Sequence, residues 1–348
     1  YQRMIRSGKR HSAATGFLHP ALSRPNLNLI THAHVTRVNS ENNHVVGVSY
    51  QTGGENHRAH ARHETLLCAG AISSPHLLQL SGIGPGELLQ NLEIPLVHDS
   101  PGVGEGLQDH YAVRVSHKIN KPISLNHRSR GVRLLWEILR WYLNGSGLLA
   151  FSPAHVGAFL RTNPESPFPD LQFVFTPASY AQSADPIGKL HPYPGITCGV
   201  WQMVPTSRGF VRAASSDPFR SPAIQPNYLS SESDQLAVVR GLKWCRKLLN
   251  TDALKPYLLD EILPGPKCQQ DDDLLTYAAK SGTTVYHPVG SCRMGTDRTA
   301  VVDPQLRLKG MTGLRVVDAS VMPTMVSANT NAATLMIAEK AAQLILDQ

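Results

Sequence analysis

Apolar and polar residues alternate through much of residues 27–69, with a polar interruption at 39–44 ("NSENNH"). Such alternation is typical of strands that bury one face. It predicts an antiparallel hairpin or meander over 27–50, followed by a third strand over 57–69.

The third strand ends in "TLLCAG" (65–70), whose continuous apolar run predicts a short buried strand. We expect a helix directly after it, capped by Ser73 or Ser74, with Pro75 at its first position and Gly82 at its end. This order of strand, glycine turn and helix places backbone N–H groups where an anion could bind. The same order is, however, a common packing unit.

Helical periodicity is found further along the chain. Helices are predicted at 230–249 and 271–281, the latter with "DDD" at its start, where the helix dipole favours acidic caps over a metal site. Residues 127–143 predict an amphipathic helix. We favour packing of its apolar side on its own domain, with a membrane surface or a dimer contact as the alternative. That side consists of Val132, Leu135, Ile138, Leu139 and Tyr142.

The end of the chain predicts another strand and helix. "LRVVDASVMP" (314–323) predicts a buried strand that runs into a polar turn at Asp318. "NTNAATLMIAEKAAQLILDQ" (329–348) begins with asparagine, a good N-cap residue, and continues as a helix. The expected packed face of that helix consists of Leu335, Ala338, Ala342 and Ile345.

Composition adds limits on the class of protein. The 348 residues are 41% hydrophobic, and at about 150 residues per domain they suggest two domains. The net charge is +7, but the basic residues are scattered, so we expect no nucleic-acid partner. No apolar run approaches the ~20 residues that span a bilayer, which excludes a transmembrane enzyme but not a peripheral one. Five widely spaced cysteines indicate a reducing compartment and neither a zinc site nor a disulfide framework.

Few residue patterns indicate chemistry by themselves. No serine lies in a GxSxG elbow, and no GxGxxG fingerprint occurs, because "GVGEGLQDH" (102–110) has leucine where the third glycine would fall. The histidines of "HRAHARH" (57–63) predict a solvated strand rather than a metal cluster. His287 precedes a proline, which favours extended backbone and suits a side chain pointing from a rigid loop into a cavity. Taken alone, such a histidine is more often structural than catalytic.

Three stretches of the chain resemble the glucose-methanol-choline (GMC) flavoprotein oxidoreductases, in particular the choline dehydrogenase type. "GAISSPHLLQLSGIG" (70–84) is similar to the family's second signature, and "YHPVGSCRMG" (286–295) to its active-site histidine motif. "GLRVVDASVMPTMVSANTNAATLMIAEKAA" (313–342) is similar to its C-terminal flavin-contacting segment.

The resemblance implies a fold of mixed α/β and α+β class. It consists of an incomplete FAD-binding domain and a substrate domain with an antiparallel sheet covered by helices. The rear of the FAD-binding domain is expected at 1–112, the substrate domain at 113–284, and the return into the FAD-binding domain at 285–348.

Motif position also implies roles for individual residues. His287 is expected to be the catalytic base and Asn331 its active-site partner. For FAD, the resemblance implies contacts from Val35 at the adenine end and from Tyr286 near the flavin. The phosphate and ring side is expected to be lined by Asp318, Ala319, Asn331 and Ala332.

The implied reaction is FAD-dependent oxidation of a primary alcohol, choline or similar, to an aldehyde, with electrons passed to a quinone or another non-oxygen acceptor. A histidine that titrates near neutrality can take the hydroxyl proton, which eases hydride loss from the carbinol carbon. An asparagine amide can orient the substrate oxygen without carrying charge. We expect a cytoplasmic enzyme, with peripheral contact to the inner face of a membrane left open. The alternatives are an oxygen-using oxidase, a GMC-type hydroxynitrile lyase and an inactive fragment.

The chain departs from the family in two respects. It begins at "YQRMIRSGKR", which resembles a point well inside a GMC chain, so we expect a C-terminal fragment without the βαβ unit that holds the ADP part of FAD. These residues alone should therefore bind FAD weakly or not at all. Gly106 stands where the family usually has asparagine, which puts a polar contact at that position in doubt.

Overall fold

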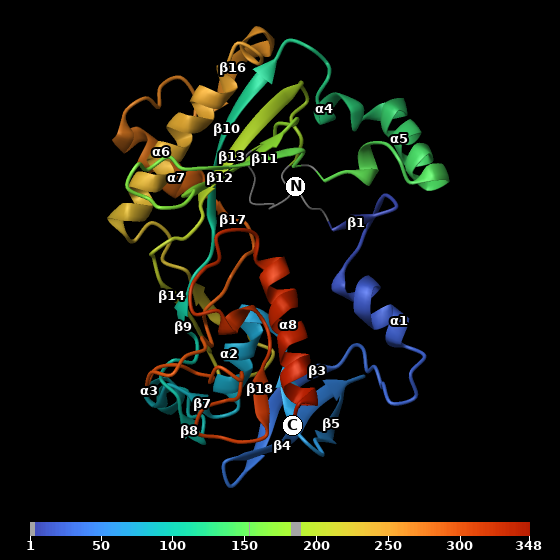
Figure 1. Ribbon diagram of the computed structural model, residues 1–348, viewed down its shortest axis with the longest axis vertical. Coiled ribbons are helices and arrows are strands. Elements are labelled where there is room, and N and C mark those ends of the chain that lie inside the picture. The colour runs from blue at the N-terminus through green and yellow to red at the C-terminus, as the bar shows by residue number, and fades with distance from the viewer. Residues whose placement is uncertain (1–3, 153, 182–188) are drawn as a thin grey trace. The chain divides into compact units, whose positions relative to one another are not determined.

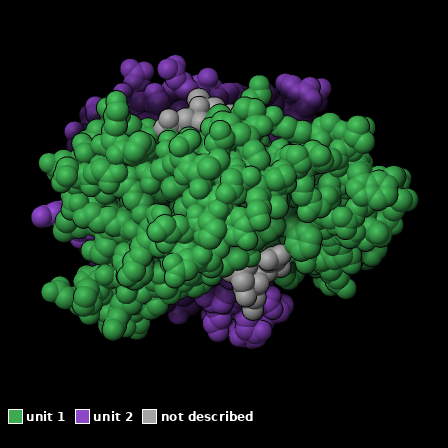
Figure 2. Space-filling model, turned by 90° about the horizontal axis from the view of Figure 1, so that it is seen from above, with its two compact units in different colours: residues 1–29, 111–202, 235–283 green, residues 30–110, 203–234, 284–348 purple. Residues whose placement is uncertain are grey.

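The computed structural model describes residues 4–152, 154–181 and 189–348, and the chain divides into two compact units (Figures 1 and 2). Unit 1 contains 1–29, 111–202 and 235–283, whereas unit 2 contains 30–110, 203–234 and 284–348. These boundaries differ from the predicted domains, because 1–29 groups with the middle of the chain and 203–234 groups with its two flanks. The assignment of the domains to cofactor and substrate stays a prediction.

An antiparallel sheet forms the centre of unit 1 (Figure 1). Its strands follow the order β11-β12-β13-β10-β16, and Leu171 and Phe173 of β12 and Val113 and Val115 of β10 are buried. Apolar residues two positions apart share one face of a strand, which explains this burial. The bounds are β10 Tyr111–Ile119, β11 Val156–Leu160, β12 Leu171–Thr176, β13 Gly195–Gln202 and β16 Leu258–Leu263; the short β17 Thr283–Thr284 also pairs with β10.

Two helices of the sheet region form where the sequence predicts them. α6 (Glu232–Leu249) approaches the sheet closely at Gly241, where an added Cβ would lie 3.0 Å from the Val200 side chain. α7 (Asp271–Ser281) begins with a capping box formed by Gln270 and Asp273. The acidic run therefore caps the helix, as predicted.

The amphipathic helix predicted over 127–143 forms as α5 (Gly131–Asn144), but its apolar side faces outward. The favoured prediction, packing of that side on its own domain, is wrong. Glu137 occupies the inner face instead and pairs with Arg128. The remaining elements of unit 1 are β1 Ile5–Arg6, β2 Lys9–Arg10, α1 His19–Ala21 and α4 Leu125–Arg128.

Unit 2 is assembled from small sheets and three helices among its described residues. The predicted hairpin forms as β3 (His34–Glu41) and β4 (His44–Thr52). The predicted third strand divides in two, because β5 (Glu55–His60) pairs with β4 whereas β6 (Thr65–Leu67) pairs in parallel with β18 (Leu314–Val316). The other elements are β7 Ile83–Gly84, α3 Gly86–Asn91, β8 His98–Asp99, β9 Glu105–Leu107, β14 Gly209–Arg212 and β15 Ala223–Gln225.

α2 (Gly70–Leu80) begins earlier than predicted, and neither Ser73 nor Ser74 is its N-cap. Asp318 performs the capping from a distant part of the chain: its Oδ2 accepts hydrogen bonds from Gly70 N (2.9 Å) and Ser74 Oγ (2.5 Å). This acceptor satisfies a backbone N–H at the helix start, which a local serine would otherwise have to do.

Pro75 lies inside α2 rather than at its first position. A proline inside a helix leaves the carbonyl four residues earlier without its helical N–H donor. That carbonyl belongs to Ala71, and Ser291 Oγ donates to it at 2.5 Å. The proline is thus accommodated by a hydroxyl from the "YHPVGSCRMG" stretch.

The C-terminal helix α8 (Thr330–Leu346) forms as predicted, but with a different packed face. Its buried residues are Thr330, Ile337 and Ala341, whereas Ala338 and Ala342 are exposed. The helix packs against the main apolar cluster of unit 2, which also includes Leu78 of α2 and Val316 of β18.

Candidate active site

His287 lies in a loop that follows β17 and has no regular secondary structure. Tyr286, directly before it, has φ +62°, an uncommon left-handed conformation for a residue with a side chain. Two hydrogen bonds hold this turn: Tyr286 N donates to Thr284 Oγ1 (2.8 Å), and His287 N donates to Asp109 Oδ1 (2.9 Å). The predicted rigid loop is therefore present, with its rigidity supplied partly by Asp109.

A second segment, residues 102–110, runs antiparallel along the histidine loop. Gly104 N donates to Ser291 O at 2.7 Å, and Gln108 and Val289 exchange a pair of backbone hydrogen bonds at 3.0 and 2.9 Å. We call 102–110 the strap. Its pairing with the loop places His110, the last residue of the strap, beside His287.

Gly106, where the resemblance suggests asparagine, has φ +78° within the strap. Glycine adopts this conformation without strain, and asparagine is among the few other residues that tolerate it. The backbone conformation therefore accounts for either residue at this position.

His110 and His287 form a direct hydrogen bond between their Nδ1 atoms, 2.9 Å apart. The other nitrogen of His110, Nε2, lies 2.7 Å from Met203 O, and a carbonyl can only accept, so Nε2 of His110 carries a proton. In a neutral His110, Nδ1 is then the acceptor, and His287 Nδ1 must donate to it. This leaves the lone pair of His287 on Nε2 and fixes the tautomer of the ring.

Asn329, rather than the predicted Asn331, lies against His287. Its Nδ2 is 3.1 Å from His287 Nε2, and an amide nitrogen can only donate, which agrees with a lone pair on Nε2. Asn329 is the N-cap residue of α8 but its side chain makes no capping hydrogen bond, whereas Asn331 is an exposed residue of the first turn. The first asparagine of "NTN" is thus the partner that the geometry supports.

Asp109 connects the strap and the segment of Tyr228 to the histidine loop. Its Oδ1 accepts from His287 N, and its Oδ2 accepts from Tyr228 Oη (2.5 Å) and from Thr284 Oγ1. The carboxylate is buried, and burial of a charge is tolerated where several donors surround it. Asp109 therefore holds His287 through its backbone N–H.

The electrostatic surroundings keep both histidines neutral. Burial, and next the nearby His110, lowers the pKa of His287 to about 4 from its ordinary value of 6.5. Burial likewise lowers the pKa of His110. A neutral His287 with an unprotonated Nε2 is the form that can accept a proton.

The residues predicted to contact FAD lie in different environments. Val35 is on β3 with 36% of its surface exposed, and Tyr286 is 62% exposed beside His287. Asp318 is buried, and its carboxylate is fully engaged, since Oδ1 also accepts from Ser320 N at 2.8 Å. Its role in this structure is to join the starts of α2 and the turn at Ala319.

The first turn of α8 contains Asn331 and Ala332, both exposed. No side chain caps this helix end, and its first turn has no acidic residue. An uncapped helix start presents N–H donors and the positive end of the dipole, which suit an anionic or carbonyl group.

Sequence reasoning missed Asp109, His110 and Asn329 as site residues. The signal for the first two was "LQDH" at 107–110, where three polar residues follow a buried leucine, but no local pattern connects that stretch to residue 287. For Asn329, the sequence indicated an N-cap position but nothing that directs its side chain to His287.

Comparison with known proteins places the chain in a family. The description "GMC oxidoreductase" matches residues 1–112 with an N-terminal profile and 205–338 with a C-terminal profile. The oxygen-dependent choline dehydrogenase of Cronobacter sakazakii is 42% identical over 340 residues, covering 97% of this chain and 60% of that protein. The oxygen-dependent choline dehydrogenase of Yersinia pseudotuberculosis is 43% identical over 345 residues, covering 97% of this chain and 59% of that protein.

Solved structures agree with the sequence matches. Pyridoxine 4-oxidase from Mesorbium loti matches with a TM-score of 0.86 at 30% identity. The match covers 99% of this chain and 63% of the oxidase chain. A formate oxidase matches with a TM-score of 0.88 at 23% identity, which shows the shared fold. The chain spans about 60% of the length of the curated relatives that it matches. Motifs, fold and both profiles agree that this chain belongs to the GMC oxidoreductase family.

Proposed function

We propose that the chain carries the base and substrate-orienting side of an FAD-dependent enzyme that oxidises a primary alcohol to an aldehyde. The observation that supports this most is the hydrogen-bonded pair of His287 Nε2 and Asn329 Nδ2, 3.1 Å apart on an exposed edge of unit 2. The names of the curated relatives, choline dehydrogenases, make choline or a similar alcohol the first substrate to test.

The pair suits one alcohol oxygen. Asn329 can donate its amide proton to that oxygen, while the hydroxyl donates its own proton to the lone pair on His287 Nε2. His110 accepts from His287 Nδ1 throughout, so the proton can only be taken at Nε2. The charge of the resulting imidazolium is stabilised by the hydrogen bond to His110.

The residues present fit part of an FAD site. The uncapped first turn of α8, with Asn331 and Ala332, offers donors and a positive dipole beside the His287–Asn329 pair. When bound, FAD would accept the hydride from the carbinol carbon. We also propose Val35, Tyr286, Asp318 and Ala319 as cofactor contacts; for Asp318 and Ala319 the backbone is the available part, because the Asp318 carboxylate is engaged.

For the electron acceptor we propose a quinone or another non-oxygen acceptor. The name of the curated relatives, oxygen-dependent choline dehydrogenase, favours molecular oxygen as the second candidate. The described residues contain no helix long and apolar enough to cross a membrane. We also propose that the enzyme is cytoplasmic and contacts the inner face of a membrane peripherally.

The test needs the rest of the cofactor site. The chain is joined to the part of the Cronobacter sakazakii relative that it does not match, loaded with FAD, and mixed anaerobically with choline and a panel of primary alcohols. We expect loss of the oxidised flavin absorbance on mixing. His287→Ala should slow this reduction by about 10²–10⁴-fold, the usual contribution of a general base, while FAD content stays the same.

His60→Ala, an exposed histidine on β5 outside the site, is the matched control and should reduce at the parental rate. An equal rate for His287→Ala would contradict the assignment of the base. Oxygen consumption with peroxide release, compared with reduction of a quinone-like dye under nitrogen, separates the two acceptors. Cyanide release without flavin reduction would instead indicate the lyase.

A further inference from the structure

The outer face of α5 is apolar along its whole length. Each of Val132, Leu135, Trp136, Leu139 and Tyr142 lies three or four positions from another of them, so they share one side of the helix. They are exposed by 81, 65, 60, 44 and 81%, and Leu143, the neighbour of Tyr142, by 71%. We call these six residues the α5 stripe. A stripe of this width normally packs into a core, so its exposure indicates an interaction surface.

The orientation of α5 is fixed by polar contacts on its inner side. Glu137 is buried, pairs with Arg128 and accepts a hydrogen bond from Leu148 N at 2.7 Å. Trp141 Nε1 donates to Gly8 O at 2.8 Å. Rotating the helix about its axis to bury the stripe would break these contacts. The Glu137 carboxylate would then lose its partners. The stripe faces outward because the sequence places a charge on the opposite side.

The segment that contains α5 and the segment that contacts it carry almost only positive charge. Segments 1–29 and 120–163 contain eleven of the 33 Lys and Arg residues and one of the 26 Asp and Glu residues, namely Glu137. The rest of the chain has 22 basic and 25 acidic residues, so these two segments account for the whole positive net charge. The structure brings them together, since Trp141 also lies 5.9 Å from the Lys9 ammonium. Basic residues that are scattered in the sequence are gathered in unit 1.

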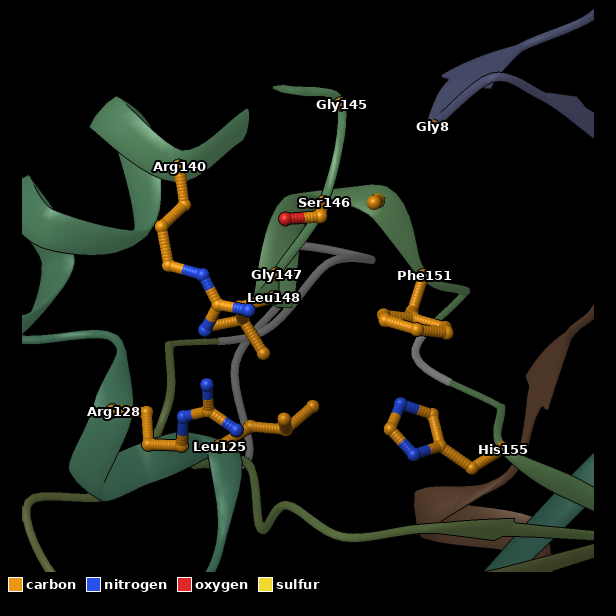
Figure 3. A pocket seen from close by; sticks show the side chains of 11 residues that line it. Gly8, Leu125, Arg128, Arg140, Gly145, Ser146, Gly147, Leu148, Phe151 and His155 are labelled. Carbon is orange, nitrogen blue, oxygen red and sulfur yellow. The ribbon is translucent and has the colours of Figure 1, made fainter. Parts of the chain in front are cut away.

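A cavity of about 760 Å³ lies beside the helix, and Arg128, Arg140, Phe151 and His155 line it (Figure 3). Glu137 can neutralise one of the two arginines, so the cavity retains positive charge. It offers guanidinium donors next to an apolar ring, which suits the phosphate of a lipid headgroup.

From the stripe, its tryptophan and tyrosine, and the basic surroundings, we infer that α5 docks unit 1 on an anionic phospholipid bilayer. The helix would lie in the plane of the interface, with the stripe among the acyl chains and the arginines at the phosphates. A nucleic acid would use the charge but not the apolar stripe, and a second copy of the chain would oppose like charges. The inference does not rest on the proposed alcohol oxidation.

The test is cosedimentation of the 348-residue chain with vesicles of phosphatidylcholine alone or with about 30 mol% phosphatidylglycerol. We expect binding to the anionic vesicles, at least about tenfold weaker binding to the neutral ones, and loss of most binding at about 0.5 M salt. Leu135→Ser combined with Leu143→Ser should weaken binding about tenfold or more, since two apolar side chains leave the interface. Arg133→Glu should weaken it about fivefold or more.

The matched controls lie elsewhere in unit 1. Phe168→Ser removes an exposed apolar residue outside α5, and Lys267→Glu reverses a charge outside the basic segments; both should bind like the parent. Circular dichroism should show an unchanged fold for every variant, because all substituted positions are exposed. Quenching of Trp136 by brominated lipid, abolished in Trp136→Phe, gives a second readout.

Several results would overturn the inference. One is equal binding by the Leu135→Ser/Leu143→Ser variant and the parent, and another is no preference for anionic vesicles. Self-association that this variant abolishes, without vesicle binding, would show a second copy as the occupant. Tighter binding to duplex nucleic acid than to vesicles, unaffected by the leucine substitutions, would assign the surface to a nucleic acid.

Discussion

At the scale of single residues, the position of the lone pair on His287 is set by a carbonyl two hydrogen bonds away. Met203 O accepts from His110, His110 accepts from His287, and the lone pair of His287 therefore faces Asn329. A histidine free to change tautomer would present a proton donor to the alcohol part of the time. His110 is thus a positioning residue that acts through His287.

Replacing His110 by phenylalanine should release the tautomer of His287. Phenylalanine has no acceptor for the Nδ1 proton, whereas His110→Gln keeps an amide oxygen that can accept it and an amide nitrogen that can donate to Met203 O. Nitrogen-15 NMR of labelled histidine reports which ring nitrogen is protonated. We expect a single Nδ1-protonated form in the parent and a mixture in His110→Phe; an unchanged spectrum in that variant would refute the positioning role.

The pKa of His287 predicts a pH dependence with a definite sign. The unfolded chain takes up a proton on this histidine near pH 6.5, but the folded chain does so only near pH 4. Between these values unfolding binds a proton, so this group makes the fold less stable as the pH falls from about 6.5 to about 4. His287→Gln should therefore lose less unfolding free energy than the parent between pH 7 and 4.5, as measured by urea titration at each pH.

At the scale of elements, helix α2 is completed by side chains from the far end of the chain. Asp318 caps its start, and Ser291 supplies the donor that Pro75 removes. The sequence suggested local serines as caps because Ser73 and Ser74 directly precede a proline. The Asp318 carboxylate, 248 residues away from Gly70, caps the helix instead, because it is buried and can accept several hydrogen bonds at once.

Ser291→Ala should destabilise unit 2. The change leaves the buried Ala71 carbonyl without a donor, at a cost of about 1–3 kcal/mol in unfolding free energy. Ser327→Ala, at an exposed position before α8, is the control and should change stability by about 0.5 kcal/mol or less. Chemical denaturation followed by circular dichroism measures both, and equal midpoints would show that water replaces the hydroxyl.

At the scale of the whole molecule, local patterns predicted the elements well and their partners poorly. The hydrophobic periodicity of 230–249 and 271–281 correctly predicted two helices. The polar stretch "NSENNH" correctly predicted a hairpin turn. The split of the third strand between two sheets depends on a pairing with β18, some 250 residues away, which no local pattern encodes. The same reason explains why His287 was found from its motif, whereas Asp109 and His110 were not.

The family resemblance singled out His287 and Asn331, whose roles stay predictions, whereas the structure places Asn329 against His287. "NTN" offers two asparagines two residues apart, and no local pattern shows which of their side chains reaches His287, 42 residues before Asn329. The outward face of α5 was missed for a related reason. Its periodicity identifies an apolar side but not what the side contacts, and only the contacts of Glu137 decide the orientation.

FAD binding by this chain is a test at the whole-molecule scale. The 348 residues contain no GxGxxG fingerprint, and the contacts that we propose would form only one side of a flavin site. We expect isothermal titration with FAD to give weak or no binding, with a dissociation constant above about 0.1 mM, a binding free energy weaker than about −5.5 kcal/mol. A purified chain that is yellow and stoichiometric in FAD would contradict this expectation.

The pairing of the strap with the histidine loop has a consequence for local unfolding. Gly104, Gln108 and Val289 form one hydrogen-bonded ladder, so the amides of Gly104 and Gln108 exchange with solvent only when the loop that holds His287 detaches. Deuterium uptake at these amides therefore reports how often the base leaves its working position. An alcohol analogue that binds at His287 should slow this uptake, even in a chain that holds no flavin.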